Sequence, residues 1–156
     1  MKFRLISKIL GTGLILFSFI QIIPALISLI YAENNVFSFF QSGLITFFTG
    51  LFLFGVNYSK DYEDLKIRDG FLLIVLLWFV FSIFAGIPFI LQEEGLSIVN
   101  AYFESVSGLT TTGATIFVNL DDQLKSVLFY RALLQWVGGL GIVVLALALF
   151  PILGIG

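Results

Sequence analysis

The chain contains neither cysteine nor histidine, and only 12% of its 156 residues are charged. The missing thiols and imidazoles exclude disulfides, thiol catalysis and the commonest transition-metal ligands. Soluble domains carry about 25% charged residues, whereas 59% of this chain is hydrophobic and its mean hydropathy is +1.08. The composition therefore argues against a water-soluble protein and favours one that lies in a lipid bilayer.

Charges are also scarce within four long apolar stretches, and Gln21 and Pro24 are the main interruptions of the first. The stretches predict membrane-spanning helices near residues 9–32, 36–58, 70–91 and 127–153. Each is longer than the roughly 20 residues that cross about 30 Å of hydrocarbon as a helix. The first follows a basic start, as a signal core does, but exceeds the roughly 7–15 apolar residues of such a core. We therefore expect a permanent anchor there and an all-α membrane protein overall.

A segment of small and hydroxyl-bearing residues, SGLTTTGAT, occupies positions 107–115 between the last two stretches. Residues 97–107 before it are too few to cross a bilayer and predict a re-entrant helix, with Ser97 as its N-cap. Irregular backbone at membrane depth must be buried in protein or line a water-filled path. Potassium filters use Thr/Gly loops whose carbonyls replace the water shell of an ion. The segment therefore predicts a filter, with a tight turn between buried helices as the alternative.

We expect the filter loop at residues 110–114, which comprises Thr110, Thr111, Thr112, Gly113 and Ala114. Potassium would bind to the backbone carbonyls of Thr111, Thr112 and Gly113. Glycine adopts positive φ at no steric cost, which lets neighbouring carbonyls turn toward an axis. A ring of carbonyls takes about four such loops, so one chain supplies only part of the site. No residue has to change protonation state, so neither a cofactor nor a catalytic constellation is expected.

Two charged residues in the apolar sequence, Glu104 and Arg131, are candidate supports of this loop. Glu104 could be an ion ligand, but we favour a buried carboxylate hydrogen-bonded behind the loop, because ionised side chains in a membrane need partners. Arg131 could act on the pore electrostatically, but we favour snorkelling to the interface or pairing with a loop acid. Nearby, Gly138, Gly139 and Gly141 predict close helix approach, with a hinge as the second interpretation.

Lysine and arginine are distributed unevenly about the predicted spans, which indicates the orientation of the chain. Six of them fall on the side of the N-terminus: Lys2, Arg4, Lys8, Lys60, Lys66 and Arg68. Only Lys125 and Arg131 fall toward the other side, so we expect both termini in the cytoplasm. The glycosylation sequon at residues 57–59 is then inside and is discounted. Five acids then lie outside: Glu33, Glu93, Glu94, Asp121 and Asp122. The last four could form a cation-concentrating vestibule or be solvated loop residues.

Two sequence motifs resemble those of a known family. Residues 101–115, AYFESVSGLTTTGAT, resemble the first pore loop of the TrkH family, the membrane subunits of bacterial Trk/Ktr potassium-uptake systems. Residues 131–142, RALLQWVGGLGI, resemble the helix after that loop, and residues 151–156 look like its exit. The resemblance implies a leading pair of transmembrane helices at residues 1–59 and one helix–pore loop–helix unit at residues 60–156.

The function that the resemblance implies is potassium transport across the cell membrane, as the N-terminal portion of a Trk-type uptake protein and not as an enzyme. The implied partners are potassium, the lipid bilayer, the remaining pore units of a full-length chain or other copies, and a cytosolic nucleotide-binding regulatory ring, with no nucleic acid. Family members carry four such units around one pore, and this chain carries one. A truncated, non-conducting structural or assembly fragment is therefore the alternative.

Overall fold

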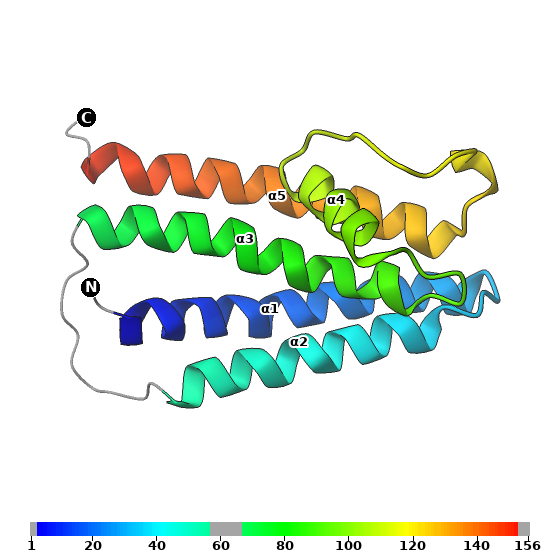
Figure 1. The fold of residues 1–156 in the computed structure, drawn as a ribbon, viewed down its shortest axis with the longest axis horizontal. Helices are drawn as coiled ribbons and strands as arrows, with labels where there is room; N and C mark the ends of the chain where they lie inside the picture. The colour runs from blue at the N-terminus through cyan, green and yellow to red at the C-terminus, as the bar shows by residue number, and fades with distance from the viewer. Residues whose placement is uncertain (1–2, 57–66, 153–156) are drawn as a thin grey trace.

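The computed structural model describes residues 3–56 and 67–152, and this part of the chain is helical apart from its connecting loops (Figure 1). Its elements are α1 (Phe3–Ile30), α2 (Val36–Val56), α3 (Ile67–Leu91), α4 (Ile98–Leu109), a short 3₁₀ helix η1 (Leu120–Asp122) and α5 (Lys125–Ile152). Four of them, α1, α2, α3 and α5, are long and apolar enough to cross a membrane. The predicted all-helical fold is confirmed for the described residues, and a helix long and apolar enough to cross a membrane lies at each of the four predicted spans.

Some predicted boundaries lie outside the described residues. These are the span ends at residues 58 and 153, the domain boundary between residues 59 and 60, and the sequon at residues 57–59. At its N-terminal end, α1 begins six residues before the predicted span. Lysine and arginine are good helix formers, so the basic start of the chain continues the apolar helix instead of ending it.

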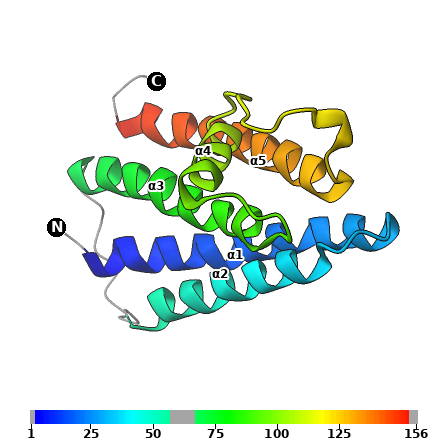
Figure 2. The same ribbon diagram turned by 45° about the vertical axis from the view of Figure 1, so that its right-hand side comes forward.

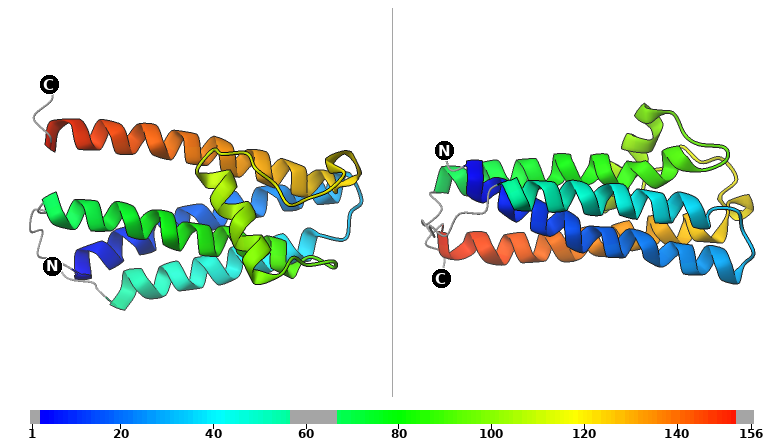
Figure 3. Two further views of the ribbon diagram at one scale, coloured as in Figure 1. Left: turned by 45° about the horizontal axis from the view of Figure 1, so that its top comes forward. Right: turned by 90° about the horizontal axis from the view of Figure 1, so that it is seen from below.

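The four long helices run side by side, and α4 lies across α3 and α5 near one end of them (Figures 1 and 2). The connections α1–α2, α3–α4 and α4–α5 gather at this end, which we call the loop end (Figure 3). α1 begins and α5 finishes at the opposite end. Four long helices therefore return the chain to the end at which it started.

α1 and α2 lie so close together at three glycines that a side chain would not fit there. A Cβ at Gly11 would lie 2.7 Å from the Gly50 carbonyl oxygen, and a Cβ at Gly50 would lie 2.9 Å from the Gly11 carbonyl oxygen. At Gly43 a Cβ would lie 2.7 Å from Ile22. Lipid tails are as apolar as leucine, so helices in a membrane associate by such close backbone packing.

A proline interrupts the hydrogen bonds of α3, and a glutamine of α1 replaces the missing donor. Pro88 has no N–H and cannot donate to the Phe84 carbonyl four residues earlier. Gln21 is fully buried and donates from Nε2 to this carbonyl at 2.7 Å. Its Oε1 accepts from the Thr46 hydroxyl of α2, also at 2.7 Å. Gln21, the polar interruption in the sequence of α1, therefore replaces the hydrogen bond that Pro88 removes from α3.

Tyr130 of α5 binds the same turn of α3. Its hydroxyl donates to the Ala85 carbonyl at 2.9 Å, and its ring lies 5.2 Å from the Phe89 ring, centre to centre. We call Gln21, Thr46 and Tyr130 the helix cluster, because they come from three long helices and two of them bind carbonyls of the fourth, α3. The cluster is neutral and lies where four helices meet.

Candidate functional site

α4 begins as the sequence predicts. Ser97 is its N-cap, and the Ser97 hydroxyl accepts from the Asn100 amide at 3.3 Å. The helix ends at Leu109, two residues later than predicted. Leu109 is only 3% exposed and packs against α5 where Gly138 makes room for it. The helix therefore continues to the start of the Thr/Gly segment, and its last residue lies against α5.

The chain leaves α4 through a Schellman motif, in which one residue takes the left-handed conformation. That residue is Thr111, with φ 60°. Its amide donates to the Gly108 carbonyl at 2.9 Å, and the Thr112 amide donates to the Ser107 carbonyl at 2.9 Å. Glycine usually holds this position, because left-handed backbone costs other residues roughly 1–2 kcal/mol. No glycine marks the position, so the sequence analysis missed it.

All four amides at the start of the predicted filter loop donate into the last turns of α4. In addition to the two bonds above, the Thr110 amide donates to the Val106 carbonyl at 2.8 Å and the Gly113 amide to the Ser107 carbonyl at 3.3 Å. Gly113 has the predicted positive φ, 77°. Residues 110–113 are exposed, and within the described part of the chain no hydrogen bond ends on their carbonyl oxygens. These oxygens are available to a ligand outside the chain.

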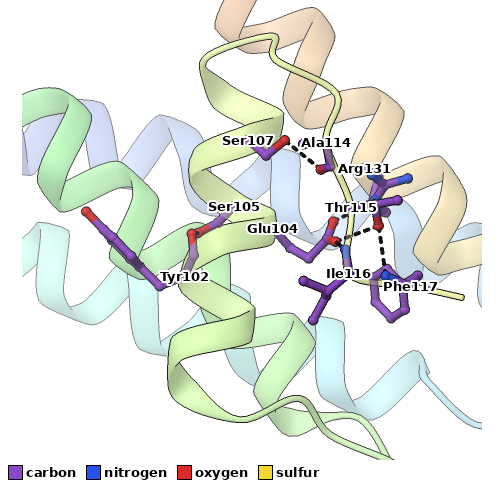
Figure 4. A network of polar contacts seen from close by, with 9 residues as sticks. All are labelled: Tyr102, Glu104, Ser105, Ser107, Ala114, Thr115, Ile116, Phe117 and Arg131. Carbon is purple, nitrogen blue, oxygen red and sulfur yellow. Dashed lines mark hydrogen bonds and ion pairs between the residues drawn. The ribbon is translucent and has the colours of Figure 1, made fainter.

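Ala114, the last residue of the predicted filter loop, differs from the four residues before it. Its carbonyl accepts from the Ser107 hydroxyl at 2.6 Å, so this oxygen is engaged within the chain (Figure 4). Ser107 thus closes the loop, with its carbonyl at the start and its hydroxyl at the end. From the sequence, Ser107 is expected only as the end of the helix and the start of the Thr/Gly segment. The signal for its second role is a hydroxyl at the junction of helix and loop.

Behind the loop, the Glu104 carboxylate is buried, with 1% of the residue exposed, and both of its oxygens are engaged. Oε1 accepts from the Thr115 hydroxyl at 2.5 Å and from the Ile116 amide at 2.6 Å, and Oε2 accepts from Arg131 Nε at 2.8 Å (Figure 4). The predicted buried and hydrogen-bonded position is confirmed. We call Glu104, Arg131, Thr115 and the Ile116 amide the loop cluster.

Arg131 pairs with Glu104 of α4, so the expectation of a loop acid or of snorkelling to the interface was wrong. Its side chain is 12% exposed, and its guanidinium carbon lies 5.9 Å from the centre of the Phe117 ring. The reason is the placement of α4, which packs against the first turns of α5 and brings a carboxylate within reach. A guanidinium with an ionic partner and an aromatic neighbour meets the need for partners at membrane depth.

The three glycines of α5 have different surroundings. A Cβ at Gly138 would collide with the Leu109 carbonyl oxygen, so close helix approach is confirmed there. A Cβ at Gly139 would be 3.8 Å from Thr111 Cγ2, an ordinary contact. A Cβ at Gly141 would have no described atom of another helix within 4 Å, so the described residues show no close approach there. Gly141 lies nearly one turn beyond the place where α5 meets the end of α4.

The four acids of the predicted vestibule all lie at the loop end. Glu93 and Glu94 belong to the α3–α4 connection, and Asp121 and Asp122 belong to η1. All four are exposed. Their exposure agrees with a vestibule and with solvated loop residues alike.

Known proteins resemble the chain over its whole length. Residues 35–156 match the family described as TrkH, cation transport protein. The chain is 48% identical to the Trk system potassium uptake protein TrkH of Escherichia coli (strain K12), with 100% of this chain and 32% of that protein covered. It is 38% identical to the Trk system potassium uptake protein TrkG of the same strain, with 98% and 32% covered. The crystal structure of the potassium transporter TrkH from Vibrio parahaemolyticus superposes with a TM-score of 0.92 at 45% identity, covering 100% of this chain and 33% of that one.

The chain therefore spans about a third of the length of these relatives. The family match takes in α2 to α5 and the entire Thr/Gly loop, whereas α1 precedes it. The resemblance that the sequence shows at residues 101–115 and 131–142 is confirmed. By its sequence and by its fold, the chain belongs to the TrkH family of cation transport proteins.

Proposed function

We propose that the chain contributes one loop to a potassium path, with the carbonyl oxygens of Thr111, Thr112 and Gly113 as ion ligands. The observation that carries the proposal is the direction of the hydrogen bonds: the amides of residues 110–113 donate into α4, and their carbonyls have no partner in the described chain. A potassium ion that loses its water shell needs such oxygens. The names of the relatives, which are potassium uptake proteins, support potassium as the ion.

In this proposal, α3, α4, the loop and α5 form one helix–pore loop–helix unit at residues 60–156, and α1 and α2 form a leading pair at residues 1–59. A ring of carbonyls takes about four loops. The site is therefore completed by further units of a longer chain or by other copies, and this chain corresponds to the N-terminal portion of a Trk-type protein. Thr110 and Ala114 frame the ion site from its two ends.

One feature beside the loop favours a cation, and a second holds the loop in place. The C-terminal end of α4 carries the negative pole of the helix dipole, and the loop starts there. The second feature is the loop cluster, in which Glu104 binds Thr115 and Ile116 while Arg131 neutralises it. We assign Glu104 and Arg131 a supporting role that holds the exit of the loop, without contact with the ion.

The proposed location is the cell membrane. Both termini of the chain lie in the cytoplasm, and the loop end of the helix bundle lies outside. The chain has no cysteine, so single-cysteine variants report position without background. Arg4→Cys should be protected from a membrane-impermeant thiol reagent applied to whole cells, and Asp121→Cys should react. Reaction of Arg4→Cys in intact cells would reverse the orientation. By family resemblance, a cytosolic nucleotide-binding regulatory ring would meet the end where α1 begins.

A chimera tests the function directly: Escherichia coli TrkH with its matching third replaced by this chain. In a strain without potassium uptake, we expect the chimera to restore growth at low potassium and the chain alone to fail. The control is the same TrkH without the matching third. A chimera that reaches the membrane at the level of the parent and takes up no potassium would contradict the proposal.

The second candidate is a non-conducting structural or assembly fragment, and the observation behind it is the single Thr/Gly loop at residues 107–115, where a ring of carbonyls takes about four. This candidate predicts that the chain alone binds the truncated TrkH in the membrane but restores no uptake, while the chimera is also inactive. Potassium uptake by the chimera would contradict the assembly-fragment candidate, because a loop that cannot conduct would leave the ring of carbonyls incomplete.

A further inference from the structure

The turn between α1 and α2 supplies the N-terminal cap of α5. Glu33 Oε1 accepts from the Lys125 amide at 2.6 Å, and Glu33 Oε2 accepts from the Ser126 amide at 3.1 Å. The first amides of a helix have no partner within it, and the positive end of the helix dipole favours a carboxylate there. α5 therefore takes its cap from a residue that lies 92 positions earlier in the chain.

The backbone that carries this carboxylate is itself fixed. α1 ends in a Schellman motif, with Ala32 left-handed at φ 52° and the Glu33 amide donating to the Ser28 carbonyl at 2.8 Å. The Ser28 hydroxyl donates to the Glu33 carbonyl at 3.1 Å. Both backbone groups of Glu33 are thus bound to Ser28, and its carboxylate is held against the first turn of α5.

A short series of contacts leads from the cap to the Thr/Gly loop. α5 begins at Lys125, and Arg131 follows six residues later, about 9 Å along the axis. Arg131 binds Glu104, and the other oxygen of Glu104 holds the Ile116 amide just after the loop. A helix transmits a displacement along its axis, so a shift of the first turn of α5 would also displace Arg131.

We propose that Glu33 is a positioning residue for the ion path. It fixes α5 along its axis against the α1–α2 pair, and it thereby sets the Arg131–Glu104 pair and the exit of the loop. The inference rests on the proposed function of the loop. It also gives a role to α1, which lies before the matched family region at residues 35–156. Glu33 acts through the backbone of α5 and does not touch the ion.

The first test measures ion preference in the chimera. Glu33→Ala and Glu33→Gln are compared with Asn34→Ala, a matched control whose side chain is exposed beside Glu33 on the same turn. The potassium KM and the inhibition by sodium are measured at equal protein level. Glu33→Ala should lower the preference for potassium about fivefold, which corresponds to about 1 kcal/mol of lost capping. Glu33→Gln keeps one acceptor oxygen and should fall in between, and Asn34→Ala should match the parent.

The second test uses amide hydrogen exchange of the chimera in lipid nanodiscs, which reports local opening. Loss of the cap in Glu33→Ala should speed exchange at residues 125 and 126. Positioning of the loop requires faster exchange at Ile116 as well, because the Ile116 amide depends on Glu104. Faster exchange confined to residues 125 and 126, with unaltered ion preference, would overturn the proposal and leave Glu33 as a local cap.

A third variant, Gly113→Ser, keeps this inference apart from the proposed function. If Gly113→Ser changes ion preference and Glu33→Ala does not, the positioning role fails and the filter stands. If neither variant changes it, both proposals fail. Should Glu33→Ala not reach the membrane, Glu33→Gln preserves the size of the side chain and decides the matter by the same two measurements.

Discussion

The helix cluster is fully buried between helices, whereas the loop cluster is partly buried behind the loop, around the buried Glu104. The two clusters also differ in charge and in the backbone that they serve. In the helix cluster, neutral side chains such as Gln21 and Tyr130 bind carbonyls of α3. In the loop cluster, the carboxylate of Glu104 binds the guanidinium of Arg131 together with a hydroxyl and an amide of an irregular segment. The helix cluster supplies a hydrogen-bond donor that a helix lacks, and the loop cluster holds a loop in place.

The difference follows from the number of hydrogen bonds that each backbone lacks. Pro88 removes a single donor from α3, and one neutral side chain, Gln21, replaces it. The segment after Ala114 has no helical bonds of its own, and a carboxylate can accept several donors at once. Charge is therefore used where the backbone is irregular. The consequence is that removing Arg131 alone would leave the buried Glu104 carboxylate without its ionic partner, and removing Glu104 alone would leave the partly buried Arg131 guanidinium without one.

The largest effect is expected for Arg131→Met. The variant leaves the Glu104 carboxylate buried without its cation, and breaking a buried ion pair in this way costs about 3–5 kcal/mol. The free energy of unfolding of the purified chain, measured by denaturant titration in detergent micelles, checks this value. Side-chain volume is nearly kept, so packing contributes little.

The double variant Arg131→Met with Glu104→Gln separates charge from geometry. Glutamine keeps an oxygen for Thr115 and Ile116 but carries no charge, so it should recover a large part of the lost stability. A double variant that is as unstable as Arg131→Met alone would show that the unpaired charge is not the cause.

The second largest effect is expected for Gln21→Leu in the helix cluster. It leaves the Phe84 carbonyl without a donor, and an unsatisfied buried acceptor costs about 1–3 kcal/mol. The same unfolding measurement applies. Adding Pro88→Ala restores an amide to α3 at the position that serves Phe84, so the double variant should regain stability relative to Gln21→Leu. No recovery would mean that Gln21 acts by packing and not as the substitute donor.

Gly113→Ser sharpens the comparison at the loop itself. There is room for the side chain, since a Cβ would lie 3.9 Å from its nearest atom, Gln135 Nε2, so the effect arises from the backbone at φ 77°. Left-handed geometry costs other residues roughly 1–2 kcal/mol, and about 1.4 kcal/mol is tenfold in an equilibrium constant. We expect the preference of the chimera for potassium over sodium to fall by up to about tenfold. Ion competition in uptake assays measures it.

The control for this variant is Thr12→Ala on α1. Thr12 is exposed near the end of the bundle opposite the loop end, and its hydroxyl donates to the Lys8 carbonyl of its own helix. This change should leave ion preference as it is. Unchanged potassium affinity and sodium discrimination in Gly113→Ser, at equal protein level, would remove Gly113 from the filter.

Features that depend on local sequence could be predicted. The four spans follow from the length of apolar runs, the start of α4 from the capping hydroxyl of Ser97, and the positive φ of Gly113 from its lack of a Cβ. The left-handed conformations of Ala32 and Thr111 could not be predicted in this way. They are imposed by Schellman hydrogen bonds to carbonyls of the preceding helix, and the residue type gives no sign of them.

Features that depend on how helices are placed against one another were missed or only half predicted. The burial of Glu104 followed from its charge. For Arg131, the expected surroundings were a loop acid or the membrane interface, and both expectations were wrong because Arg131 pairs with Glu104. Glu104 and Arg131 are two lone charges of opposite sign in apolar sequence, and pairing them was the available signal. The capping of α5 by Glu33 has no such signal, because it requires the α1–α2 turn to meet a helix 92 residues away.

The smallest effect is expected for Tyr130→Phe, although Tyr130 is the neighbour of Arg131 in α5. Successive residues of a helix point about 100° apart, so Tyr130 belongs to the helix cluster while Arg131 belongs to the loop cluster. The variant removes one neutral donor from the Ala85 carbonyl, which in a helix also accepts the amide four residues later, and it keeps the ring contact with Phe89. The free energy of unfolding should therefore fall by less than about 1.5 kcal/mol, well below the loss in Arg131→Met. Equal losses for these two adjacent substitutions would mean that the two clusters do not differ in the way their charges suggest.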